Sequence, residues 1–275
     1  MNSNADRARN LERAGELVAE AAAEGAELVV LPEKWPLLGS AEVLREGAEP
    51  LDGPAMTAAA GWAAERGIWL LAGSFAERPD AEGSERLFNT SPLFGPDGRL
   101  LAVYRKLHLF DVEVDGVVYR ESESEAPGEE IVVSEVAGVP LGMSICFDLR
   151  FPELYRILAL RGARILAVPS AFTEATGRDH WEVLLRARAI ENACFVVAAD
   201  QVGEAPPQFR SFGGSLVCDA WGQVLCRVER GEGVAVAELD FDEQLAIRER
   251  MPCLDARRPD VYEWPESGHL TGSTA

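Results

Sequence analysis

The segment ELVVLP, residues 27–32, has the pattern of a short β-strand, with apolar side chains at four consecutive positions. A strand without polar alternation is typically buried on both faces, as in a sheet that helices cover. RILAVPS, residues 164–170, repeats this pattern in the second half of the chain. The two runs therefore predict an α/β protein whose sheets are covered by helices.

Helical patterns alternate with these strands along the chain. An apolar stripe at helical spacing predicts a first helix over residues 5–24, which Gly25 terminates. Further helices are predicted at 53–67, 152–161, 178–192 and 241–250. Further strands are predicted at 68–75, 89–94, 100–105, 139–145, 194–201, 214–220, 222–228 and 233–239. The order of these elements indicates two mixed sheets packed together with helices outside.

The remaining segments are expected to be irregular. Residues 110–130 are acidic and poor in apolar side chains, which predicts a long surface loop of the kind that is usually functional or disordered. Residues 265–275 are expected to form a flexible tail. No repeat or linker divides the sequence, so we expect a single domain over residues 1–275.

The charge and composition restrict the partners. A formal net charge of −20, from 46 acidic and 26 basic residues, disfavours nucleic acid and anionic membranes. We therefore expect a small-molecule substrate and further copies of the chain as partners. The sequence has neither an apolar run of ~18 residues nor a signal-peptide core, which indicates a cytoplasmic protein. Its five cysteines form no CxxC pair and its three histidines show no ligand spacing, so we expect no metal and no cofactor.

Three predicted strands end on reactive side chains. ELVVLP is followed by Glu33, LLAVYR (100–105) by Lys106, and VPLGMSI (139–145) by Cys146. Strand ends in an α/β sheet open on a common crevice, so we expect these three side chains to meet.

A thiol, a carboxylate and an ammonium together have the chemistry of a hydrolase. Glu33 can take the thiol proton and return it to a departing amine. Lys106 and the backbone N–H of Phe147 can donate hydrogen bonds to the negative oxygen of a tetrahedral intermediate. A cation and a base beside Cys146 are also expected to raise its thiolate fraction.

Simpler interpretations of these residues stay open. A cysteine after an apolar strand is usually part of the core, and a charged residue at a strand end usually lies in solvent. A core role is assigned to the other cysteines, Cys194, Cys218, Cys226 and Cys253. A protease-like dyad of Cys146 and His108 is the lesser alternative, and the lack of a GxSxG motif disfavours a serine hydrolase.

Three segments resemble, in order, the signature motifs of the nitrilase superfamily, the carbon-nitrogen hydrolases. They are ELVVLPE (27–33), YRKLHLFDVEV (104–114) and GMSICFDLRFPELY (142–155). The similarity runs from about residue 10 to Tyr262. Residues 169–192, 219–225 and 257–262 also look like the branch that contains deaminated glutathione amidase and omega-amidase. This branch favours an amidase over a nitrilase proper.

The resemblance implies a four-layer αββα sandwich that assembles through its outer helices into a homodimer or a larger homo-oligomer. It implies that Cys146 attacks the carbonyl of a small carboxylate-bearing amide, that Glu33 protonates the departing ammonia, and that water activated by Glu33 hydrolyses the thioester. Nitrile or carbamoyl hydrolysis on the same triad, and an inert binding protein on the same fold, are the alternatives.

A second glutamate commonly holds the lysine in this family. We match it to Glu121, ahead of Glu113, Glu123 or Glu125, which makes the acidic segment a wall of the pocket. Ser170, in PSAFTEATG (169–177), is closer to deaminated glutathione amidase than to omega-amidase.

Three residues just beyond strand ends are the expected substrate-binding residues: Arg150, Phe172 and Thr173. For Arg150, a structural ion pair with Asp148 or Glu153 is an equally weighted alternative.

Two features depart from the family pattern. Met1 is followed at once by NSNADRARN (2–10), where family members begin with a strand of the form VAAVQM. The first strand is therefore expected to be absent or to lie upstream, which would leave apolar surface and unpaired backbone on its neighbour. A chain extended upstream is expected to be more soluble. Gly214 and Ala220 replace a frequent histidine and proline, which leaves the exact substrate open.

Overall fold

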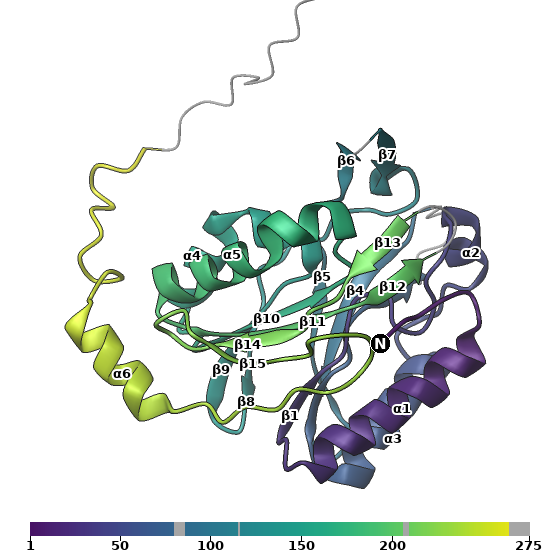
Figure 1. Ribbon diagram of the computed structural model, residues 1–275, viewed down its shortest axis with the longest axis horizontal. Helices are drawn as coiled ribbons and strands as arrows, with labels where there is room; N and C mark the ends of the chain where they lie inside the picture. The colour runs from purple at the N-terminus through teal and green to yellow at the C-terminus, as the bar shows by residue number, and fades with distance from the viewer. Residues whose placement is uncertain (80–85, 115, 206–208, 264–275) are drawn as a thin grey trace, which may run out of the picture.

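The computed structural model describes residues 1–79, 86–114, 116–205 and 209–263 and has the expected layers (Figure 1). Two sheets pack face to face. Helices α1 (Arg7–Ala23) and α3 (Pro54–Arg66) cover one side, and α4 (Pro152–Leu160) and α5 (Glu174–Asn192) cover the other. The αββα sandwich is confirmed. The predicted tail at 265–275 lies outside the described residues.

The first sheet has five strands, in the order β1-β2-β4-β3, with β5 also paired to β4. They are β1 (Leu28–Val30), β2 (Trp69–Leu71), β3 (Phe75–Glu77), β4 (Phe88–Phe94) and β5 (Leu100–Arg105). Residues 68–75, predicted as one strand, are divided at Gly73, which has a φ of 50°. A Cβ at this position would lie 2.0 Å from the carbonyl oxygen of Pro32, so the close approach to the end of β1 requires glycine.

The second sheet has six strands in the order β15-β14-β11-β10-β9-β8. They are β8 (Val133–Val136), β9 (Val139–Met143), β10 (Ile165–Ser170), β11 (Phe195–Asp200), β14 (Leu216–Cys218) and β15 (Val224–Arg227). Strands β9, β10 and β11 are parallel, so their carboxyl ends meet at one edge of the sheet. All six residues of β10 are buried, as RILAVPS predicted.

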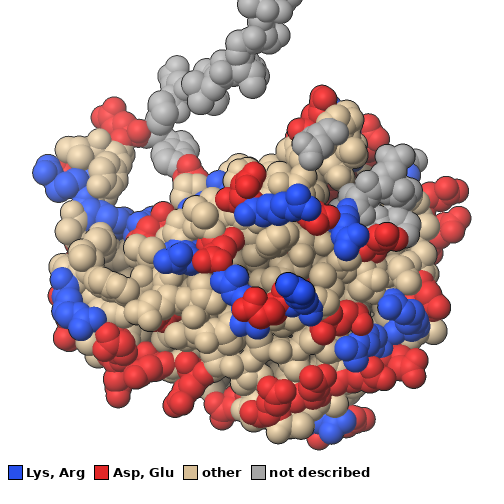
Figure 2. Space-filling view, viewed as in Figure 1, with Lys and Arg blue, Asp and Glu red and all other residues tan. Residues whose placement is uncertain are grey.

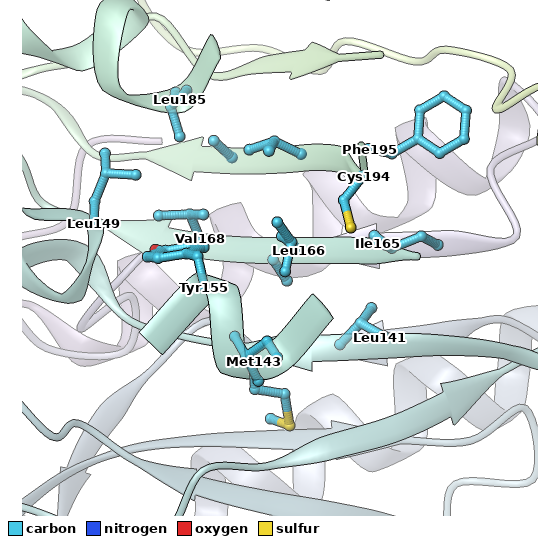
Figure 3. Packing of buried hydrophobic residues seen from close by; sticks show 14 of the residues in the cluster. Leu141, Met143, Leu149, Tyr155, Ile165, Leu166, Val168, Leu185, Cys194 and Phe195 are labelled. Atoms are coloured by element: carbon cyan, nitrogen blue, oxygen red, sulfur yellow. The ribbon is translucent and has the colours of Figure 1, made fainter. Parts of the chain in front are cut away.

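The main core fills the space between this sheet, its helices and the facing sheet. Met143, Leu166 and Val168 of the sheet pack with Tyr155 of α4 and Leu185 of α5 (Figure 3). Burial of one such side chain contributes about 1.5–3 kcal/mol. This packing holds the carboxyl ends of β9 and β10 in fixed positions. Several residues of the candidate site come directly after these strand ends in the chain, so the packing also fixes where they lie.

The acidic segment at 110–130 is more ordered than predicted. It contains the hairpin of β6 (Asp111–Val114) and β7 (Val117–Arg120), followed by the 3-10 helix η1 (Glu121–Glu123). Polar and apolar residues alternate in β6, burial alternates along both strands, and Gly116 in the turn has a φ of 75°. The expectation of an irregular loop was therefore wrong.

Several other elements were not predicted individually. They are α2 (Ala41–Glu46), β8, and the hairpin of β12 (Val202–Ala205) and β13 (Phe209–Phe212). Helix α6 (Phe241–Arg250) lies where it was predicted.

The strand predicted at 233–239 is not formed. A groove of about 730 Å³ is lined by Met1, by residues of β1 and by residues 233–239. Within the described chain β1 pairs only with β2, so its other edge faces this groove unpaired. A strand needs a hydrogen-bonded neighbour, and the groove leaves the 233–239 segment without one.

One face of the molecule is shown with its charges in Figure 2. Over α1 and α3, acidic side chains predominate and basic ones lie between them rather than in a patch. Among the described residues, no helix combines the length and apolarity that a membrane crossing requires.

Candidate active site

Cys146 begins the 3-10 helix η2 (Cys146–Arg150), close after the end of β9. Its φ of 46° is uncommon for a residue with a side chain and is maintained only where the surrounding structure enforces it. The residue is 8% exposed. Burial and, to a smaller extent, the neighbouring Glu33 carboxylate raise the pKa of the Cys146 thiol well above its ordinary value. The thiol therefore rests protonated, contrary to the expected rise in thiolate fraction, and needs a base to react.

Glu33 supplies a carboxylate beside this thiol. Its Oε1 accepts hydrogen bonds from Lys106 Nζ (2.9 Å) and Asn89 Nδ2 (2.8 Å), and its Oε2 accepts one from the backbone N–H of Ala171 (2.8 Å). The residue follows β1 and is buried. Three donors hold the carboxylate in one orientation at the cavity that Cys146 also lines.

Lys106, at the end of β5, lies between two glutamates. Its Nζ donates to Glu33 Oε1 and to both oxygens of Glu121, at 3.1 Å and 2.9 Å. Burial lowers the pKa of Lys106, but the Glu121 and Glu33 carboxylates outweigh it and raise that pKa well above its ordinary value. Glu121 also accepts the backbone N–H of Phe110 at 2.7 Å. Burial opposes its ionisation, yet Lys106 and Lys34 lower the pKa of Glu121. The lysine therefore stays cationic between two anions.

A cavity of about 350 Å³ opens beside these groups, and every predicted site residue lines it. The eight are Glu33, Lys106, Glu121, Cys146, Phe147, Arg150, Phe172 and Thr173. Phe147 contributes the second N–H of η2, a position at which a 3-10 helix has no internal acceptor. The turn that places Cys146 at the cavity thus leaves the adjacent backbone N–H of Phe147 free of a helical acceptor.

Arg150 ends η2 and is partly buried at the cavity. Its guanidinium lies 5.1 Å from the centroid of the Phe172 ring and contacts His180 Nδ1 at 3.2 Å. Among the described residues it forms no ion pair. Asp148 instead binds Tyr104 Oη (2.6 Å) through Oδ2. The alternative of a structural ion pair is therefore not supported, and burial without a carboxylate partner lowers the pKa of Arg150.

Phe172 and Thr173 lie between β10 and α5. The backbone N–H of Phe172 donates to the buried Asp200 carboxylate at 2.8 Å, and its ring contacts Trp181 with centroids 5.1 Å apart. Thr173 precedes the first residue of α5, and its hydroxyl is 2.8 Å from that of Thr176. Both residues are buried and fixed, so they form a rigid wall of the cavity.

The structure does not support the cysteine-histidine dyad. His108 Nδ1 lies 2.7 Å from Asp148 Oδ1, and its ring stacks on Phe151 at a centroid distance of 3.6 Å. It is not among the residues that line the cavity, whereas Glu33 is. The four cysteines other than Cys146 do not line the cavity either. Cys194 and Cys218 are buried as expected, but Cys226 is only partly buried and Cys253 is exposed, so the core role expected for Cys253 was wrong.

Three further residues of the site were missed as such by sequence reasoning. Asn89 binds Glu33, and Lys34 binds both Glu125, at 2.6 Å, and Glu121, at 3.3 Å. Position next to Glu33 was the available signal for Lys34. Glu125 was considered only as an alternative to Glu121 for the role of holding Lys106. In the structure both glutamates bind Lys34. The other two candidates for that role, Glu113 and Glu123, are exposed.

The remaining expectations concern metals and the two departures. Within the described ranges, no group of three or more His, Cys, Asp or Glu residues could hold a metal ion. Gly214 accepts a hydrogen bond from Trp181 Nε1 (2.9 Å), and Ala220 is buried. Neither residue lines the cavity, so neither departure changes its wall directly.

Comparisons with known proteins agree with this geometry. The family model for carbon-nitrogen hydrolases matches residues 1–249. Human deaminated glutathione amidase is 43% identical over 95% of this chain and 81% of its own length. Omega-amidase NIT2 of Xenopus tropicalis is 37% identical over 94% and 93%. The crystal structure of the Caenorhabditis elegans NitFhit protein superposes with a TM-score of 0.88 at 37% identity, and the match covers 96% of this chain and 64% of that one. The chain belongs to the carbon-nitrogen hydrolase family and is an amidase that acts on bonds other than peptide bonds.

Proposed function

We propose that this amidase hydrolyses a small amide that bears a carboxylate, through a thioester on Cys146. One observation carries the proposal: Cys146, Glu33, Lys106 and Arg150, an arginine with no acidic partner among the described residues, line the same cavity. The first three supply nucleophile, base and cation, and the fourth supplies a charge for the substrate to neutralise.

In the acylation half of the proposed reaction, Cys146 Sγ attacks the amide carbonyl while Glu33 accepts its proton. A general base is required because the buried thiol rests protonated. Lys106 Nζ and the Phe147 N–H donate to the developing oxyanion, a role in which one donor is typically worth on the order of 10²-fold in rate. Glu33 then gives its proton to the amide nitrogen, the C–N bond breaks, and ammonia leaves.

In the deacylation half, water enters the position that ammonia has left. Glu33 accepts a proton from the water as its oxygen attacks the thioester carbonyl, and the same two donors hold the oxyanion. The C–S bond breaks, the proton returns from Glu33 to Cys146 Sγ, and a carboxylic acid is released. Glu33 thus acts as base and acid in each half. The three donors to the Glu33 carboxylate hold its two oxygens in the same positions during both halves of the reaction.

Deaminated glutathione is our first candidate substrate and 2-oxoglutaramate the second. Both substrates carry a carboxylate, and the planar guanidinium of Arg150 can donate two parallel hydrogen bonds to it. The greater identity to the human deaminated glutathione amidase supports the first, together with Ser170 in the segment after β10.

The test measures ammonia release from both amides with the natural chain, Cys146→Ala and the control Cys253→Ala. Cys253 is an exposed thiol that does not line the cavity. We expect activity on at least one amide that disappears in Cys146→Ala and persists in the control. Activity that survives Cys146→Ala would refute the proposed nucleophile.

We further propose that the chain forms a homodimer through its outer helices. Large apolar side chains remain exposed on α4 and α5, namely Ile157, Leu160, Val183 and Ile190. Exposed apolar side chains of this size favour association. Light scattering after size exclusion tests it: we expect twice the chain mass, and Val183→Lys should shift the mass toward that of one chain.

A further inference from the structure

A second lysine-glutamate pair lies behind the proposed triad. Lys34 Nζ is 2.6 Å from Glu125 Oε1 and 3.3 Å from Glu121 Oε1. The Lys34 side chain is 11% exposed and that of Glu125 is completely buried, yet both residues line the cavity. Burial of an ion pair usually yields little net stability, because desolvation cancels most of the Coulombic gain. A role beyond folding therefore needs consideration.

The backbone of Lys34 is also unusual. Its φ is 50°, in the left-handed region, directly after Glu33. The Lys34 N–H donates to Ser74 Oγ at 3.0 Å, which fixes this conformation. Strained backbone of this kind concentrates at functional sites, where surrounding contacts enforce it. The same turn thus places both Glu33 and Lys34 in the charged cluster.

Glutamates and lysines alternate along one path. Glu125 binds Lys34, Lys34 binds Glu121, Glu121 binds Lys106, and Lys106 binds Glu33. Glu121 therefore accepts hydrogen bonds from both lysines. Removal of Lys34 would leave Glu121 and Glu125 without the lysine that binds them both.

We propose that Lys34 and Glu125 are positioning residues of the reaction. Glu125 fixes Lys34, and Lys34 holds Glu121 in the orientation that directs Lys106 to Glu33 and the thiol. This inference rests on the proposed function and deepens it, because it assigns a task to two residues that touch no reacting atom. Lys34 also supplies a positive charge that favours ionised carboxylates in the cluster.

Two other roles predict different measurements. A lysine that contacts the substrate would change KM and leave kcat almost unaltered when it is replaced. A purely structural pair would change only the melting temperature. A positioning pair changes kcat and the pH profile of the thiol, because the base and the cation lose their alignment.

The variants are Lys34→Met, Lys34→Arg and Glu125→Gln, with Glu49→Gln as the control. Glu49 is buried and pairs with Arg7 at 2.7 Å, but it does not line the cavity. The first measurement is the rate of Cys146 alkylation by iodoacetamide from pH 5 to 10, resolved by peptide mass spectrometry with Cys253 as internal reference. The second is kcat and KM for ammonia release.

We expect Lys34→Met to lower kcat by about 10- to 100-fold with KM nearly constant, since misplacement near 1 Å costs on the order of 10²-fold. Its alkylation profile should move to higher pH, because Lys106, the cation that lowers the pKa of the thiol, loses its alignment. Glu125→Gln should show a smaller effect in the same direction as Lys34 loses its fixed partner, and Lys34→Arg should recover part of the loss. Glu49→Gln should lower the melting temperature alone.

Unchanged kcat and pH profile in Lys34→Met, or a rise confined to KM, would overturn the inference. If Lys34→Met does not fold, the double variant Lys34→Met/Glu125→Met removes both partners of the pair at once, a change that proteins often tolerate. It should show the same loss of kcat. Failure of the proposed function would give different results. The Cys146→Ala variant would keep its activity, or Cys146 of the natural chain would not be alkylated.

Discussion

Replacement of Arg150 by methionine tests the proposed substrate class. The guanidinium is partly buried, stacks on Phe172 and contacts His180, and no carboxylate in the described chain neutralises it. A substrate carboxylate would therefore meet a cation whose own desolvation has already been achieved during folding. Methionine keeps the length and the apolar contact with Phe172 but removes the charge and the hydrogen-bond donors.

The size of the effect follows from the contact that would be lost. A hydrogen bond to a charged group contributes about 1.5–3 kcal/mol. Solvent reaches part of Arg150, so we take about 2–3 kcal/mol for the whole contact rather than the sum of two such bonds. This corresponds to a fall of about 30- to 150-fold in kcat/KM for a carboxylate-bearing amide. A neutral amide has no such contact to lose, so its kcat/KM should change less than threefold.

The assay compares 2-oxoglutaramate or deaminated glutathione with butyramide, in the natural chain, Arg150→Met and Arg150→Lys. Lysine keeps the charge without the planar fork, so we expect an intermediate loss on the carboxylate substrates. Equal losses on the charged and the neutral amide in Arg150→Met would refute the reasoning, because they would place Arg150 in the support of the catalytic residues rather than in substrate binding.

Three further predictions follow from the structure. Glu33→Gln should lower kcat by about 10²- to 10⁴-fold, the usual contribution of a general base, and a loss below tenfold would contradict that role. The three groups that contact Glu33 are all donors, so the NH₂ group of the glutamine would also face a donor. Burial, reinforced by Glu121, raises the pKa of Glu125 from 4.5 to about 8, so the folded chain binds a proton there more tightly than the unfolded chain. This stabilisation is complete below about pH 4.5 and is lost as the pH rises through about 8. Urea unfolding at pH 5 and pH 9 should show that the free energy of unfolding of the natural chain, relative to Glu125→Gln, falls as the pH rises. A relative free energy that rose with pH would contradict the raised pKa. A strand of alternating apolar residues added ahead of Met1 should raise the melting temperature and the solubility, because Met1 lines the groove beside the unpaired edge of β1. A polar extension of equal length is the control. Equal melting temperatures and solubilities for the two extensions would contradict this prediction.

Much of the site could be predicted because its signals are local. Runs such as ELVVLP and RILAVPS reveal burial on both faces through their composition alone, and the residue that ends such a run lies at the edge of a sheet. Glu33, Lys106 and Cys146 were found in this way, and motif resemblance added Glu121. The structure places all four at one cavity.

The errors have a physical cause that is equally specific. The 233–239 segment has the alternation of a strand, but a strand exists only when a neighbour pairs with it, and none of the described strands pairs with this segment. The hairpin of β6 and β7 was overlooked because an acidic composition masked the alternation of its first strand, DVEV. Local patterns report which side chains are apolar, and they do not report which backbone edges find partners.

By itself, the sequence determined the layers, the family motifs and the strand ends that carry the reactive groups, because these depend on periodicity within a few residues. Tertiary structure alone decided what those groups contact. Lys34 meets Glu125 across 91 positions, Asn89 meets Glu33 across 56, and the thiol is buried deeply enough to remain protonated. Such contacts and pKa shifts arise from how two sheets pack against each other, which no local stretch of residues encodes.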